Sequence, residues 1–107
     1  MRKLKKHSLK GSILYIIKSH KKSNAIKAKE LRRKLGCDGR IIRTLIHELR
    51  VEDNIPICSG NDGYFYPDDI SEARHSVNRL RSSARELFDA AEGIEKAFEK
   101  DKQLSIV

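Results

Sequence analysis

Apolar residues recur at helical spacing in four parts of the chain, and polar residues, glycine or proline separate these parts. The first part predicts a helix that begins at Ser8 as its N-cap and ends near Ser19. The second predicts a helix over residues 27–35, which Gly36 would end in the left-handed conformation. Asp38 is then placed to cap a third helix. The chain is therefore predicted to open with three short helices.

The third helix carries a wide apolar stripe and is followed by two β-prone runs. The stripe consists of Ile41, Ile42, Leu45, Ile46 and Leu49. Residues 55–58 and 64–66 favour strands, and residues 59–63 between them are rich in types that form tight turns. Ile26 lies in a short extended segment that is expected to pair with the edge of this hairpin. A β-hairpin after the third helix is therefore expected.

The last part of the chain predicts one long helix. Asp69 and Glu72 form a capping box at its start. Apolar residues then alternate at spacings of three and four over four heptads, a pattern typical of helices that pack against a second helix. The predicted interface consists of Val77, Leu80, Ala84, Leu87, Ala91, Ile94 and Phe98.

The simplest second helix is the same helix of another subunit, so a homodimer is expected, and folding back onto the same domain is the alternative. The flanking positions lack the complementary charges of a parallel zipper, which leaves the parallel and antiparallel orientations both open.

Charge divides the chain into two halves. Of the 107 residues, 1–66 contain 16 Lys and Arg against 6 Asp and Glu, a net charge of +10, whereas 67–107 contain 7 against 9, a net of −2. The basic half suggests a phosphate-bearing partner, and the two halves are expected to have different partners.

The segment AKELRRKLGCDGRIIRTLIHELR resembles the helix-turn-helix core of bacterial and phage winged helix-turn-helix domains. IPICSGNDGYFYPDD, followed by LRSSARELFDAAEGIE, is similar to small phage and prophage winged-helix proteins. The expected fold is mainly α with a small β-hairpin (α+β). The expected organisation is a flexible basic arm (1–7), a winged helix-turn-helix domain (8–66), a long dimerisation helix (67–101) and a tail (102–107).

This resemblance implies that the third helix reads double-stranded DNA in the major groove. The candidates for base contacts are Arg40, Arg43, Thr44 and His47. The candidates for phosphate contacts are Lys10, Lys27, Lys29, Arg33 and Arg50. The expected function is sequence-specific binding of double-stranded DNA, as a transcriptional regulator or as an accessory protein of phage replication or recombination.

The predicted wing departs from this family because all charged residues between Val51 and Ala73 are acidic, and phosphate would repel them. The alternative function is therefore a protein interaction module. It would use the winged-helix core and the long helix to bind a replication, transcription or host protein, without specific DNA binding.

The sequence offers no catalytic chemistry, so we expect neither an enzyme nor a cofactor. The four histidines lack paired metal-ligand spacing, and Cys37 and Cys58 are expected to be reduced thiols of a cytoplasmic protein. No Gly-rich phosphate loop precedes a Lys and Ser or Thr. The apolar run over 13–17 is too short to cross a bilayer, so no membrane partner is expected. The expected location is the cytoplasm of a bacterial or phage-infected bacterial cell.

Overall fold

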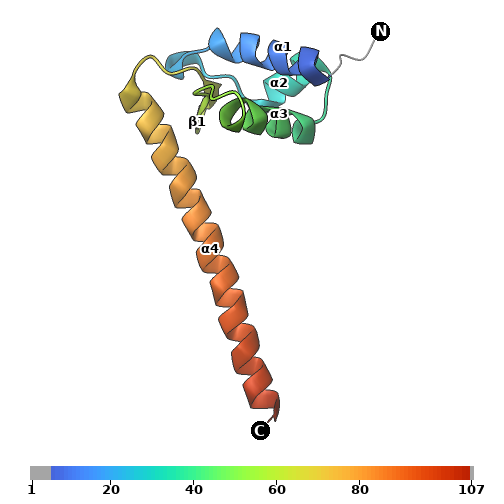
Figure 1. Cartoon of the computed structure of the whole chain (residues 1–107), viewed down its shortest axis with the longest axis vertical. Helices are drawn as coiled ribbons and strands as arrows, with labels where there is room; N and C mark the ends of the chain where they lie inside the picture. The colour runs from blue at the N-terminus through green and yellow to red at the C-terminus, as the bar shows by residue number, and fades with distance from the viewer. Residues whose placement is uncertain (1–5, 107) are drawn as a thin grey trace. The chain divides into compact units, whose positions relative to one another are not determined.

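The computed structural model describes the backbone of residues 6–106 and the side chains of residues 8–101. The chain forms two compact units, Met1–Ser76 and Val77–Val107. In chain order the elements are α1 (Lys6–Lys18), the short 3-10 helix η1 (Lys22–Asn24), α2 (Ala28–Leu35), α3 (Gly39–Val51), β1 (Cys58–Gly60), β2 (Gly63–Phe65) and α4 (Ile70–Ile106) (Figure 1). The predicted class, mainly helical with a small antiparallel hairpin and a long C-terminal helix, is confirmed.

The helices α1, α2 and α3 pack around one apolar core (Figure 1). The buried side chains of this core are Leu9, Ile13 and Ile17 of α1, Leu31 of α2, Ile42, Leu45, Ile46 and Leu49 of α3, and Ile26 and Ile57 outside the helices. Each such side chain contributes about 1.5–3 kcal/mol on burial. Ile41 was predicted to share this stripe but is 45% exposed, because it lies at the edge of the buried face of α3.

Two predicted helix ends between α2 and α3 are confirmed. Gly36 adopts a φ of 61°, and its N–H donates to the Arg32 carbonyl at 2.8 Å. The carboxylate of Asp38 accepts a hydrogen bond from the Arg40 N–H at 2.9 Å, which satisfies one of the free donors at the start of α3. These two caps fix a turn of three residues between the helices.

The first and the last helix are both longer than predicted. α1 begins at Lys6, so Ser8, predicted as the N-cap, lies inside the helix. Nothing between these two residues breaks a helix. The predicted basic arm, residues 1–7, falls for its larger part outside the described residues. α4 continues to Ile106, and the side chains of the predicted tail lie outside the described residues.

The hairpin is shifted along the chain from its predicted position. β1 and β2 are antiparallel, with Cys58 opposite Phe65, and a turn of two residues joins them. The predicted strand over 55–58 is mostly irregular instead. Its first N–H, that of Ile55, donates to the Leu49 carbonyl near the end of α3 at 2.9 Å, so this backbone is held by the helix.

A third extended segment pairs with the hairpin, as the sequence predicted. The Ile26 N–H donates to the Tyr64 carbonyl, and the Tyr64 N–H donates to the Ile26 carbonyl, both at 2.8 Å. The Ile26 side chain is buried in the core. This bridge fixes the chain immediately before α2, so the hairpin supports the helix that precedes α3.

The start of α4 is held in the first unit by two sets of hydrogen bonds. The carboxylate of Asp69 accepts from the Glu72 N–H at 2.9 Å, which confirms one half of the predicted capping box. The Glu72 carboxylate accepts from the Asp68 N–H at 2.9 Å, one residue before the N–H of the predicted box. The Ser76 hydroxyl, 4% exposed, accepts a hydrogen bond from the Ser59 N–H at 3.0 Å.

From Val77 to Asp101 every side chain of α4 is exposed in the single chain. The exposed fractions of Leu87, Ile94 and Phe98 are 73%, 71% and 68%. The predicted interface residues thus form an uncovered apolar stripe. No helix among the described residues has the length and apolar character needed to cross a membrane.

Candidate nucleic-acid interface

The exposed face of α3 carries the four predicted base contacts. Arg40, Arg43, Thr44 and His47 are separated by three, one and three residues, so they lie on one face of the helix, and all four are exposed. The opposite face is buried in the core. The structure therefore brings these residues together, with two guanidinium groups, a hydroxyl and an imidazole directed to solvent.

Arg32, a residue of α2, also reaches this face, at the N-terminal end of α3. A Cβ atom built on Gly39 would lie 3.3 Å from Cδ of Arg32 and 3.6 Å from Nη1 of Arg43. Both side chains thus pass close to the same backbone at the first residue of α3, where the glycine leaves room for them. Within the described part of the chain, neither guanidinium forms an ion pair with a carboxylate. Two guanidinium groups therefore lie beside the same backbone, and neither is engaged in an ion pair within the described residues.

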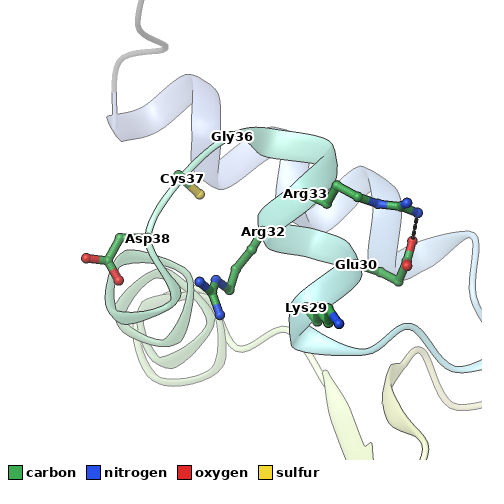
Figure 2. Close-up of a pocket in the computed structure, with 7 residues that line it drawn as sticks. All are labelled: Lys29, Glu30, Arg32, Arg33, Gly36, Cys37 and Asp38. Carbon is green, nitrogen blue, oxygen red and sulfur yellow. Dashed lines mark hydrogen bonds and ion pairs between the residues drawn. The ribbon is translucent and has the colours of Figure 1, made fainter.

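A surface hollow lies between α2 and the turn that leads to α3 (Figure 2). It is lined by Lys29, Glu30, Arg32, Arg33, Gly36, Cys37 and Asp38. Figure 2 shows that Arg32 extends toward the start of α3, whereas Arg33 leaves in another direction and meets Glu30, with 2.6 Å between Nη2 and Oε2. Glu30 offsets the charge of Arg33, so Arg32 and Lys29 dominate the positive charge of the hollow.

The other predicted phosphate contacts of α2 are accessible. Lys27 precedes the helix and Lys29 lies in its first turn, and both side chains are exposed. Their ammonium groups, together with the first free N–H groups of α2, favour an anion at this end of the helix. Arg33 is also exposed, although its ion pair with Glu30 reduces its charge toward a ligand.

Lys10 is engaged within the fold. Its Nζ atom lies 2.8 Å from the Asp53 carboxylate and 3.8 Å from that of Glu48. The hydrogen bond to Asp53 raises the pKa of Lys10, and desolvation opposes it more weakly. Because two acids already neutralise this ammonium group, we leave Lys10 out of the proposed interface.

Arg50 also has an internal role that the sequence did not indicate. Its Nε donates to the Ile57 carbonyl at 2.9 Å, its Nη2 approaches the Ser59 hydroxyl at 3.4 Å, and its guanidinium lies 6.0 Å from the centre of the Tyr64 ring. Burial lowers the pKa of Arg50. This side chain attaches the hairpin to α3, so we also leave it out of the proposed interface.

The acidic residues around the hairpin are mostly occupied. Asp53 pairs with Lys10, Asp68 lies 3.0 Å from the ammonium of Lys21, and Asp69 caps α4. Within the strands and turn of the hairpin, Asp62 is the one acidic residue. The lysine partners of Asp53 and Asp68 therefore reduce the expected repulsion between an acidic wing and phosphate, while Glu52 and Asp62 stay exposed.

Sequence reasoning missed Arg32 and Gly39. Arg32 belongs to a run of three basic residues, and helical periodicity places it on the polar face without indicating which neighbour it reaches. Its approach to Arg43 depends on how α2 crosses α3. The available signal was Gly39, the first residue of α3, directly after the cap Asp38. A glycine at this position leaves room for side chains to pass over the backbone.

Within the described residues, no three His, Cys, Asp or Glu side chains gather in a way that could hold a metal ion. Comparison with known proteins gave no match to a protein-family model, to a curated protein or to a solved structure. The winged-helix resemblance of the sequence segments therefore stays a prediction.

Proposed function

We propose that the first unit of this protein binds double-stranded DNA, with the exposed face of α3 in the major groove. The groove is wide enough for an α-helix, and an Arg fork matches the O6 and N7 acceptors of guanine. Arg40 and Arg43 supply two such forks, and Thr44 and His47 supply smaller groups on the same face. Lys27 and Lys29 would contact phosphates and contribute affinity without sequence choice.

The observation that carries this proposal is the convergence of Arg32 and Arg43 beside Gly39. Two guanidinium groups on the same backbone, neither in an ion pair, repel each other in the free protein. A phosphate or a base edge that accepts from both would relieve this repulsion. The pair stands at the N-terminal end of α3, which is the end that enters the groove in helix-turn-helix complexes.

Selection of bound sequences from a random duplex pool tests sequence recognition. We expect a preferred site, and Arg40→Ala with Arg43→Ala should weaken binding to that site by about 1–3 kcal/mol per lost base contact. Binding to random DNA should fall much less. An equal loss on both duplexes would exclude direct base readout by these two residues.

Salt titration tests the phosphate contacts. Lys29→Ala should weaken binding to all duplexes by a similar factor and reduce the slope of log K against log salt by about 1 for each bound chain, or about 2 for the proposed dimer. Lys100→Ala in α4 removes the same charge outside the proposed interface, so it should leave the slope nearly unchanged. If both variants reduce the slope equally, the phosphate contacts are not where we place them.

The proposal includes pairing of two chains through the apolar stripe of α4, so that two copies of α3 bind one two-fold symmetric site. The heptad spacing and the exposure of Leu87, Ile94 and Phe98 support this pairing. Avidity would then strengthen a single module of modest affinity. A role in the cytoplasm of a bacterial or phage-infected cell, as a regulator or a replication or recombination accessory protein, is part of the same proposal and rests on the sequence resemblance.

A second candidate function is a protein interaction module, which the uncovered stripe of α4 also supports. In that case the stripe would bind a replication, transcription or host protein. The two candidates differ in one measurement. Absence of duplex binding at about 50 mM salt, where phosphate contacts are strongest, would favour the protein partner.

A further inference from the structure

We propose that α4 pairs with α4 of a second copy of this chain in the antiparallel orientation, in the register that places Arg81 opposite Glu95 of that copy. This inference rests on the proposed pairing and adds its orientation and register. Both residues are exposed, and they flank the apolar stripe on the same side.

The sizes of the stripe residues favour this orientation. In a parallel, in-register pair each residue meets its own copy, so Ala84 would meet Ala84 and Leu87 would meet Leu87. Layers of two small residues would then alternate with layers of two large ones, and the helices could not keep one separation. In the antiparallel register Ala84 faces Ile94 and Leu87 faces Ala91. Each of these central layers combines a small and a large residue, so the distance between the helix axes stays even over residues 84–94. Farther out in the same register, Leu80 faces Phe98 and Val77 faces Asp101.

The charges beside the stripe favour the same orientation. In heptad notation one flank, the e positions, carries Arg74, Arg81, Phe88 and Glu95. The other flank, the g positions, carries Ser76, Ser83, Ala90 and Ala97. In a parallel pair the charged flank faces the uncharged one. In an antiparallel pair the charged flank faces its own copy in reverse, which brings Arg81 next to Glu95 on both sides of the two-fold axis.

The whole helix shows the same asymmetry. Residues 77–88 contain three arginines and one acid, a net charge of +2, and residues 90–101 contain four acids and two lysines, a net of −2. The antiparallel register lays each of these segments along the other. In a parallel pair, segments of the same net charge would lie beside each other over the full length of the helices.

Neither Arg81 nor Glu95 is neutralised within its own helix. The charged residue one turn from Arg81 is Arg85, and those one turn from Glu95 are Glu92 and Glu99. Like charges at these spacings destabilise a single helix. By contrast, Glu92 does find a partner in the same helix, Lys96, at 2.8 Å. Arg81 and Glu95 thus have no oppositely charged residue one turn away in their own helix, so each is available to a partner on a second helix.

Phe88 gives an independent indication. This ring is 76% exposed and lies outside the heptad stripe, at an e position. In a parallel pair it would face Ser83 and stay largely in water. In the antiparallel register it lies beside the two-fold axis and faces Phe88 of the second copy, which buries both rings.

Charge reversal tests the orientation, with the monomer–dimer equilibrium of the full chain measured by sedimentation. Arg81→Glu and Glu95→Arg should each weaken self-association about tenfold at low salt, because each places two like-charged pairs across the interface. An equimolar mixture of the two variants should recover dimers, since both cross pairs become opposite in charge. The matched control is Arg85→Glu, the same charge change on the outer face of α4, which should have little effect.

Cross-linking gives a second readout that does not depend on charge. Under mild oxidation, a mixture of Ala84→Cys and Ile94→Cys chains should form a disulfide-linked heterodimer, and Ala84→Cys alone should not. The unaltered chain controls for its native thiols. A disulfide in Ala84→Cys alone indicates the parallel pair and overturns our assignment.

The outcomes separate this inference from the proposed function. If the unaltered chain dimerises but both charge reversals behave like Arg85→Glu, the orientation is wrong and the pairing stands. If the chain stays monomeric up to about 100 µM, pairing and orientation both fail. The duplex selection tests DNA binding in either case.

Discussion

Gly63 offers the sharpest test of how the hairpin supports the candidate interface. Its φ is 125°, and a Cβ atom at this position would lie 2.3 Å from the Ile26 carbonyl oxygen and 2.8 Å from the Lys27 nitrogen. The contacted atoms are backbone, so they cannot move aside as a flexible side chain would. In Gly63→Ala the bridge between Ile26 and Tyr64 must therefore open or shift.

The expected cost of Gly63→Ala follows from two contributions. A non-glycine residue at this φ costs about 1–2 kcal/mol. Opening the bridge loses two backbone hydrogen bonds, those of 2.8 Å between Ile26 and Tyr64, at about 1 kcal/mol each. The free energy of unfolding should fall by about 3–4 kcal/mol, which lowers the melting temperature of a domain of this size by roughly 15 °C or more.

Urea denaturation followed by tyrosine fluorescence and circular dichroism measures this change. The control is Gly11→Ala on the exposed side of α1, where nothing lies within 4 Å of the added atom. That variant should gain about 0.5–1 kcal/mol, because alanine is the better helix former. A Gly63→Ala protein within about 1 kcal/mol of the unaltered chain would refute the close packing of the hairpin on the segment before α2.

Three further predictions concern groups that join the hairpin to the helices. Ser76→Ala removes the buried hydroxyl that accepts from the Ser59 N–H and should lower the free energy of unfolding by about 1–3 kcal/mol in urea denaturation. Arg50→Met keeps the length of the side chain but loses the hydrogen bond to the Ile57 carbonyl, and should cost about 1–2 kcal/mol while leaving the salt dependence of DNA binding unchanged. Burial raises the pKa of Cys58, so the stability contributed by its neutral thiol is complete below the ordinary thiol pKa of about 8.5 and is lost as the pH rises through the higher folded value. The free energy of unfolding should thus fall on the alkaline side, and Cys58→Ala should flatten that fall; an unchanged slope would contradict this reasoning.

Local signals in the sequence predicted much of the fold because they act between neighbours in the chain. Gly36, Asp38 and the Asp69 cap are each confirmed at the residue named. The hairpin was predicted after α3, where it lies, but its first strand was placed at 55–58 instead of Cys58–Gly60. The reason is that the Ile55 N–H bonds to the end of α3, a contact between segments that β-propensity does not include.

The candidate interface was predictable in part for the same reason. Helical periodicity placed Arg43 and its neighbours on the exposed face of α3, and the structure has them there. The internal hydrogen bonds of Arg50 and the ion pair of Lys10 depend on which elements pack together. Residue type alone therefore could not distinguish Arg50 and Lys10 from basic residues that have no partner within the fold. The approach of Arg32 to Gly39 has the same origin.

The proposed orientation of α4 also bears on the proposed DNA site, because each first unit continues into α4 after Ser76. At a rise of about 1.5 Å per residue, the antiparallel register places the two Ser76 residues about 40 Å apart along the helix axes. In a parallel pair they would be separated only by the distance between the axes, about 10 Å. Either pair is two-fold symmetric, so symmetry of the selected site alone does not distinguish them. The spacing does, since one turn of B-DNA is about 34 Å. If each first unit binds DNA close to its own Ser76, half-sites one turn or more apart fit the antiparallel pair, whereas abutting half-sites fit the parallel pair.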